Sequence, residues 1–399
     1  MAFNFDLAPQ RRGTNCSKWD DVAASLGIAP GDDLLPLSVA DMDFFCAPEI
    51  LDAVRGAIAP GALGYRHFSP RFGQAVAGWM QRRHGLTVQP EAVISLPGVV
   101  PGIAAAIAAF TQPGDGVIVQ IPAYPPFTNV TGDMGRTLRE NRLIEREQDG
   151  VLTYEINFDQ LRALAAEPNT RLMVLCSPHN PTGRCYSREE IAQISAICAE
   201  HDVFLVSDEI HSDLVRRGVR FVPALAVTCE NTRVCQLGSP SKSFNTAGTH
   251  AAYMIIPDPE ARAAVRRIFS SMHLPTSSFV SEEVVTTAYG PAAYYPDELC
   301  AYLDGNIAFF TETMHAALPG IRMTHPDGTY LVWADFRGCG VPADRIYRLL
   351  CEKARVIPTP GYAFDPQAMG YLRINLAMPR AMLKEATTRI IEAIRDFNK

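Results

Sequence analysis

The best candidate for a chemically reactive group in this sequence is a single lysine among serines. Lys242 lies within the segment Ser239-Pro-Ser-Lys-Ser-Phe-Asn-Thr-Ala-Gly248, between two apolar runs, 233–238 and 251–256, that are typical of buried strands. An ammonium group at the mouth of an apolar sheet is costly in free energy unless it has a partner. It has a use there if the amine reacts covalently, for example as a Schiff base to a phosphorylated aldehyde. The alternative is a loop lysine whose charged end simply reaches solvent.

Three other segments each place a polar or aromatic residue just after a predicted buried strand: Tyr124, Asn180 and Asp208. The three strands are predicted over residues 117–121, 172–176 and 203–206. In doubly wound α/β sheets, ligands bind beyond the carboxyl ends of the strands. We therefore expect these residues to meet Lys242 at one site, although Tyr124 by itself could equally pack under its loop.

Two further segments are suited to bind anions. Gly98 precedes an alanine-rich helix, so the free N–H groups of Val99 and Val100 would suit a phosphate, although many glycines simply precede helices. In the predicted strand 371–375, Arg373 alternates with apolar neighbours and points to the opposite face. There it could bind a substrate carboxylate, but arginines paired with structural acids are at least as common.

The order of elements predicts a doubly wound α/β unit followed by a smaller α+β unit. A helix is expected over 47–59, and Ser187 with Glu190 predicts a capping box at the start of another. From about residue 290 the alternation of strands and helices weakens. Residues 292–297 are predicted to connect the two domains, and a long helix is predicted over 299–318. We predict a large domain over 46–289 and a small domain formed by 1–45 and 290–399.

Composition excludes several classes of protein. The net charge of -7 argues against a nucleic-acid surface, and the 399 residues contain no apolar run long enough for a membrane span. The N-terminal residues lack an apolar signal core, so secretion is not expected. Ten cysteines without any CxxC pair argue against a metal site and favour a reducing cytoplasm.

Several motifs resemble those of the fold-type I pyridoxal-phosphate enzymes, the aminotransferase class I/II group: SPHNPTG, SDEIH, SPSKSFNTAG and YLRINLA. Within that group, VADMDF, the LGY loop and SDEIHSDL are similar to the cystathionine β-lyases of the MalY/PatB kind. The resemblance extends from Arg12 to Arg380. It implies a large domain with a mostly parallel seven-stranded doubly wound sheet, a smaller α+β domain, and pyridoxal 5'-phosphate as cofactor.

The resemblance also implies roles for individual residues. Lys242 would hold the cofactor as a Schiff base and move the Cα proton, and Asp208 would keep the pyridine nitrogen protonated. Asn180 would bind the phenolic oxygen and the substrate, and Tyr124 would stack on the ring. The phosphate would be held by Val99, Val100, Ser239 and Ser241.

Substrate recognition is implied to involve two chains. Arg373 would bind the α-carboxylate, while Tyr65 would reach the substrate from a second subunit, which implies a homodimer with shared active sites. His211 stands where aminotransferases usually have a tyrosine beside the ring oxygen. Because free imidazole titrates near neutrality, we expect His211 to change charge in mild acid.

Other departures from the family pattern leave the substrate open. Residue 250 is His where aminotransferases commonly have an arginine for the phosphate, so we expect phosphate affinity to come from elsewhere. Ser38 replaces a tryptophan, and Tyr295-Pro296 replaces a Trp-Leu pair. The usual glycine-rich turn before the substrate arginine reads Phe-Asp-Pro-Gln-Ala-Met-Gly over residues 364–370. The expected reaction is β-elimination from a cysteine S-conjugate such as cystathionine, giving a thiol, pyruvate and ammonia. Transamination, a replacement reaction and a vestigial site with a binding role are the alternatives.

Overall fold

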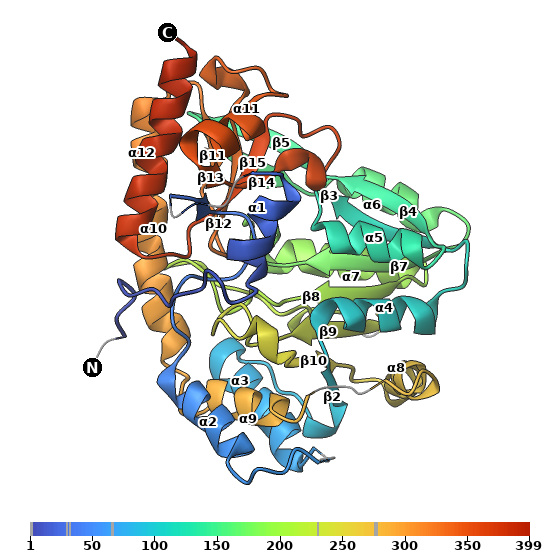
Figure 1. Cartoon of the computed structure of the whole chain (residues 1–399). Coiled ribbons are helices and arrows are strands. Elements are labelled where there is room, and N and C mark those ends of the chain that lie inside the picture. The colour runs from blue at the N-terminus through green and yellow to red at the C-terminus, as the bar shows by residue number, and fades with distance from the viewer. Residues whose placement is uncertain (1–2, 29–30, 32, 65–67, 230, 275–277) are drawn as a thin grey trace.

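The computed structural model describes residues 3–28, 31, 33–64, 68–229, 231–274 and 278–399. These residues fold around two large β-sheets, each covered by helices, and also form a small two-stranded sheet (Figure 1). No helix of the described residues is both long and apolar enough to cross a membrane.

The larger sheet has seven strands in the order β2-β10-β9-β8-β7-β3-β4. Their bounds are β2 Val93–Leu96, β3 Gly116–Ile121, β4 Thr137–Arg142, β7 Thr170–Cys176, β8 Phe204–Asp208, β9 Val234–Gly238 and β10 Ala252–Ile255. Five consecutive strands run parallel, and β10 is antiparallel to both of its neighbours. The predicted mostly parallel, doubly wound sheet is therefore confirmed. Its central strands are mostly apolar and are buried along nearly their whole length, because helices cover both faces.

Helices cover both faces of this sheet. One face packs against α4 (Val99–Phe110), α5 (Pro125–Asp133) and α8 (Pro259–Ser271). The other packs against α6 (Phe158–Ala166) and α7 (Arg188–Glu200). The capping box predicted for α7 is present: Ser187 Oγ accepts from the Glu190 N–H at 3.2 Å, and Glu190 Oε2 accepts from the Ser187 N–H at 2.8 Å.

A third group of helices lies at the end of the large sheet farthest from the small one (Figure 1). It consists of α2 (Pro48–Ile58), α3 (Pro70–His84) and α9 (Ser281–Ala288), which pack on one another and on β2 and β10. The helix predicted over 47–59 corresponds to α2 within one residue at each end.

The second sheet has six strands in the order β14-β15-β12-β11-β6-β5. Their bounds are β5 Ile144–Gln148, β6 Val151–Glu155, β11 Arg322–Thr324, β12 Leu331–Asp335, β14 Thr359–Pro360 and β15 Tyr371–Asn375. The hairpin β5–β6 comes from the segment predicted for the large domain, and β6 pairs in parallel with β11. The boundaries at 46 and 289 stay a prediction, but this hairpin, although it comes from within the predicted large domain, belongs to the second sheet alone.

One long helix connects the two units. α10 (Tyr295–Ala317) begins inside the predicted joint 292–297, not after it, because Pro296 is compatible with the first turn of a helix. Its first half places Leu299 in the core that includes α3, and its second half places Phe310 in the core of the small unit. There it packs beside α12 (Arg380–Phe397) (Figure 1).

The remaining β-strands and α-helices are short. They are β1 (Leu35–Pro36), which pairs with β13 (Val356–Ile357), and the helices α1 (Val22–Ser25) and α11 (Ile346–Leu349).

Candidate active site

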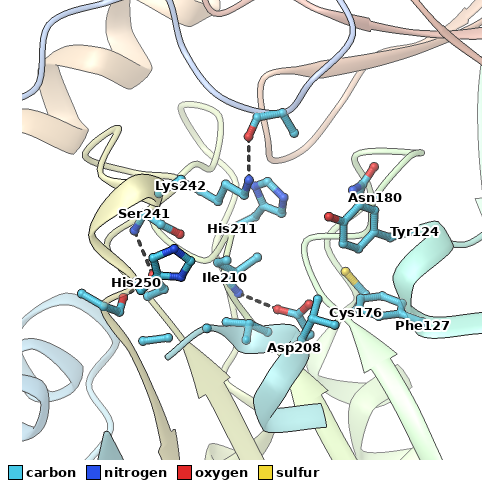
Figure 2. Close-up of a pocket in the computed structure, with 18 of the residues that line it drawn as sticks. Tyr124, Phe127, Cys176, Asn180, Asp208, Ile210, His211, Ser241, Lys242 and His250 are labelled. Carbon is cyan, nitrogen blue, oxygen red and sulfur yellow. Dashed lines mark hydrogen bonds between the residues drawn. The ribbon is translucent and has the colours of Figure 1, made fainter. Parts of the chain in front are cut away.

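A cavity lies at the carboxyl ends of β3, β7, β8 and β9 (Figure 2). These four strands are parallel neighbours in the order β3-β7-β8-β9, so the segments that follow them meet at one edge of the sheet. Of the predicted site residues, the cavity lining brings together Val99, Val100, Tyr124, Asn180, Asp208, His211, Ser239, Ser241 and Lys242. Tyr65 lies outside the described residues, so its predicted role stays a prediction.

Lys242 reaches the cavity from the loop that follows β9. Its Nζ donates a hydrogen bond to the carbonyl of Ala40 at 2.6 Å (Figure 2). Burial lowers the pKa of Lys242 to about 8; nearby Asp41 and Asp208 oppose this shift and Arg373 adds to it. A lysine with a lowered pKa supplies neutral amine near physiological pH, as a nucleophile or proton acceptor must.

Asp208 ends β8, on the floor of the cavity. Its Oδ1 accepts a hydrogen bond from the backbone N–H of Ile210 at 3.1 Å. Burial raises the pKa of Asp208 to about 6, against the opposing effects of that N–H and of Lys242. Among the described residues no cation lies within salt-bridge distance of this carboxylate. The protonated pyridine nitrogen of the expected cofactor would supply a positive charge beside it.

Arg373 comes from β15 of the small sheet and touches the cavity through Asn180. Its Nη1 donates to Asn180 Oδ1 at 3.1 Å, and its Nη2 donates to the Ser38 carbonyl at 2.7 Å. Burial lowers the pKa of Arg373 to about 10, and Nε has no partner among the described residues. No described carboxylate pairs with Arg373. The alternative that this arginine pairs with a structural acid is therefore not found among the described residues. β15 is buried along its whole length, because side chains of both sheets cover its faces.

His211 corrects one prediction. Burial, followed by the nearby charges of Lys242 and Arg373, holds the pKa of His211 well below the ordinary value for histidine. Its Nδ1 has no hydrogen-bond partner among the described residues, and its ring lies edge-on to Tyr330 with centroids 6.1 Å apart. The expectation that His211 changes charge near neutrality is therefore wrong: a fully desolvated imidazole between two cations stays neutral.

Tyr124 stands at the start of α5 on the other side of the cavity. Its ring meets that of Phe127 edge-on, at 5.4 Å and an angle of 87°, which fixes its orientation. Figure 2 shows Tyr124 and Asn180 together, across the cavity from Ser241.

The opposite end of the cavity is built from backbone groups and hydroxyls. Gly98 precedes α4 in an extended conformation without any side-chain cap, which leaves the N–H groups of the first turn available. Ser239 Oγ donates to the Ala251 carbonyl at 2.7 Å and accepts from the Ser241 N–H at 3.0 Å. His250 also lines this end, where the sequence predicted no contribution from it.

A strap formed by residues 38–44 crosses the site and was not predicted to do so. Its Ala40 carbonyl accepts hydrogen bonds both from Lys242 and from the Tyr330 hydroxyl, the latter at 2.9 Å. Asn375 Nδ2 donates to the carbonyls of Val39 and Asp41 at 2.7 Å each. The VADMDF motif marked this segment, but only these contacts show that it anchors the lysine.

Comparison with known proteins gives one consistent result. The model of the family described as Aminotransferase class I and II matches residues 32–390. The chain is 36% identical to Cystathionine beta-lyase PatB of Bacillus subtilis (strain 168), covering 98% of this chain and 100% of that protein. It is 32% identical to Protein MalY of Escherichia coli (strain K12), covering 98% and 99% respectively. The crystal structure of cystalysin from Treponema denticola, which contains a pyridoxal 5'-phosphate cofactor, superposes with a TM-score of 0.93 at 30% identity over the full length of both chains.

Proposed function

The chain belongs to the aminotransferase class I and II family, and from this premise we propose that it is a pyridoxal-phosphate-dependent carbon–sulfur β-lyase. Its substrates are cystathionine or related cysteine S-conjugates, and its products are a thiol, pyruvate and ammonia. The observation that carries the proposal is the end-to-end similarity to a cystathionine β-lyase, with Lys242, Asp208 and Asn180 gathered at one cavity.

The residues at the cavity fit pyridoxal phosphate. One end offers the uncapped first turn of α4 and the hydroxyl of Ser241, as a phosphate requires. The other end offers Asp208, a buried carboxylate without a described cation, as a pyridine nitrogen requires. Lys242 lies between them, and Asn180 and Tyr124 complete the wall that would face the ring.

The cofactor, when bound, supplies an electron sink for the electron pair left when a Cα proton departs. The protein's own groups do the rest. Lys242 Nζ, with its lowered pKa, accepts the proton from Cα. Asp208 would face the ring nitrogen and stabilise a positive charge there, and Arg373 with Asn180 would bind the substrate carboxylate. The Cβ–S bond then breaks, the sulfur leaves as thiolate, and the remaining three-carbon enamine is hydrolysed to pyruvate and ammonia.

The enzyme acts as a homodimer in this proposal, with Tyr65 contributed by the neighbouring subunit. What supports the dimer is a set of exposed apolar side chains on α2 and in the segment after it, Leu51, Ile58, Leu63 and Phe68, together with Leu274, which lines one groove with Phe68. The cytoplasm is the proposed location, and all ten cysteines being free is what supports it.

A product ratio tests the reaction. With cystathionine or an S-alkyl cysteine and no added keto acid, the purified protein should release thiol and pyruvate in equal amounts over many turnovers. If product forms only when a keto acid is supplied, and the nitrogen is recovered in a new amino acid, the protein is an aminotransferase. Incorporation of an added thiol without pyruvate release would instead identify a replacement reaction.

A further inference from the structure

His250 lies at the end of the cavity where the cofactor's phosphate group would bind. It shares this end with the first residues of α4, Ser239 and Ser241, and Figure 2 shows it beside Ser241. Its backbone is left-handed, with φ 53°, and closes a short turn in which its N–H donates to the Ala247 carbonyl at 3.3 Å. Among the residues that the structure describes, the cavity lining contains no arginine. Beside Lys242 and the buried His211, His250 is the third basic side chain of the described lining.

The hydrogen bond of His250 fixes which ring nitrogen is available. Nδ1 is 3.1 Å from the carbonyl oxygen of Pro97. A carbonyl only accepts, so Nδ1 carries the hydrogen and donates it. In the neutral ring Nε2 then bears a lone pair, which a phosphate oxygen would not accept as a partner. Nε2 becomes a donor to phosphate only when a second proton binds and the ring becomes an imidazolium.

The other charged groups of the site do not replace this interaction. Lys242 shares the loop of His250 but donates to Ala40. Asp208, the last residue of β8, and His211, which follows that strand, face the cavity from another segment. Near α9, Ser281 Oγ donates to the His250 carbonyl at 3.4 Å, and Glu282 is engaged by the N–H and hydroxyl of Ser69. The α4 and β2 segments contribute no charged side chain to the described lining.

We propose that His250 is a ligand of the phosphate group of pyridoxal phosphate, and that it binds as an imidazolium, so that cofactor affinity is coupled to uptake of a proton. The proposal rests on the proposed cofactor. It replaces the sequence-based expectation that phosphate affinity comes entirely from elsewhere. A fixed cation such as arginine would give no such coupling, since it stays charged throughout the range in which imidazole titrates.

The test measures the dissociation constant of pyridoxal phosphate from the apoprotein by equilibrium dialysis between about pH 6 and pH 8.5, the range in which an imidazole titrates. Wild type is compared with His250→Arg, which keeps a charge, and with His250→Gln, which keeps a neutral donor. The phosphate's own second ionisation, near pH 6, and the reaction of Lys242 act equally on all three proteins and cancel in ratios.

We expect the ratio of the wild-type constant to that of His250→Arg to rise with pH, by up to about tenfold per pH unit for the uptake of one proton. The ratio of His250→Gln to His250→Arg should stay constant. Calorimetry in buffers of different ionisation enthalpy should show proton uptake by wild type that His250→Gln lacks. This second readout needs only wild type and one variant, should the arginine variant fold poorly.

Parallel pH profiles for wild type and His250→Arg would overturn the proposal, as would equal proton uptake by wild type and His250→Gln. Pyridoxal, which lacks the phosphate, should show no difference between the three proteins; a difference there would assign His250 to another part of the cofactor. Failure of every variant to bind pyridoxal phosphate at any pH would instead overturn the proposed cofactor.

Discussion

At the scale of single residues, the site contains ionisable groups whose desolvation is not fully offset by ion pairs or hydrogen bonds within the protein. The pKa values of Lys242, Asp208 and Arg373 are all displaced toward the neutral forms, and burial is the largest cause for each. A cofactor with a protonated ring nitrogen and a substrate with a carboxylate would supply the missing partners. Buried groups without partners lower the free energy of unfolding of the apoprotein, and ligand binding raises it again.

Asp208→Asn should separate stability from function. The carboxyl pKa is raised from 3.8 to about 6 in the fold, so the native state binds more protons than the unfolded state between these values. This group therefore makes the apoprotein less stable as pH rises from about 4 to about 6, and the penalty persists above that. The apo variant should be more stable than wild type at neutral pH, by about 1–3 kcal/mol in urea unfolding. Its turnover with cofactor should fall by about tenfold or more. Unchanged turnover would remove Asp208 from the mechanism.

Lys242 should control the rate at which the apoprotein combines with the cofactor. Only the neutral amine attacks an aldehyde, and the pKa of Lys242 is lowered to about 8. At saturating pyridoxal phosphate, the rate of appearance of the yellow absorption band should rise about tenfold per pH unit below pH 8 and level off above it. Lys242→Ala should show no band that borohydride removes. A rate that keeps rising beyond pH 10 would mean that the lysine is not desolvated.

At the scale of elements, the lysine loop is held by a buried network from α3. Asp213 Oδ2 accepts from Ser243 Oγ at 3.2 Å, and its Oδ1 accepts from Trp79 Nε1 at 3.2 Å. Oδ1 also lies 3.1 Å from His84 Nε2. Helix α3 and the residue next to Lys242 are thus joined through one carboxylate, so the position of the lysine depends on how this helix packs.

Asp213→Ala should lower the free energy of unfolding by about 2–5 kcal/mol, because it leaves buried donors on two elements without their acceptor. Asp297→Ala is the matched control: Asp297 pairs with Arg83, which also lies 3.8 Å from Asp213, but its own side chain is 67% exposed. The control should lose no more than about 1 kcal/mol. Urea unfolding of both apoproteins measures the difference; equal losses would mean that the Asp213 network does not hold the loop.

At the scale of the whole molecule, two sheets and two copies of the chain would build each site. The cavity lies on the large sheet, Arg373 comes from the small sheet, and the 38–44 strap passes between them. The proposed second copy would cover the exposed apolar side chains near α2 and bring Tyr65 to the site.

Glutamate at Leu51 and Ile58 together should prevent dimer formation. The two side chains lie seven positions apart on α2, hence on one face of the helix, and both are exposed. Sedimentation analysis should find a folded monomer without lyase activity. Leu7→Glu, at a position that is 56% exposed and outside this set, should leave the dimer intact. A double variant that stays dimeric would place the interface elsewhere.

Mixing two inactive variants tests the shared site directly. Tyr65→Phe and Lys242→Ala should regain partial activity after their subunits exchange, since one site of the mixed dimer receives both intact residues. Demonstrated exchange without recovery would mean that Tyr65 does not act on the neighbouring subunit.

The sequence by itself determined the large sheet, the positions of the residues at its strand ends and the family. These depend on local patterns: buried parallel strands read as apolar runs, and polar residues after them fall at one edge. It also determined the capping box of α7, which needs only residues three positions apart.

Only the tertiary structure decided which of these groups keep a charge and what holds them. His211 is neutral because burial and two cations from distant segments surround it, and Lys242 is anchored by Ala40, 202 positions away in the chain. The hairpin β5–β6 joins the small sheet, and His250 reaches the cavity through a contact with Pro97. Desolvation and long-range hydrogen bonds depend on which segments pack together, and no local pattern in the sequence encodes that packing.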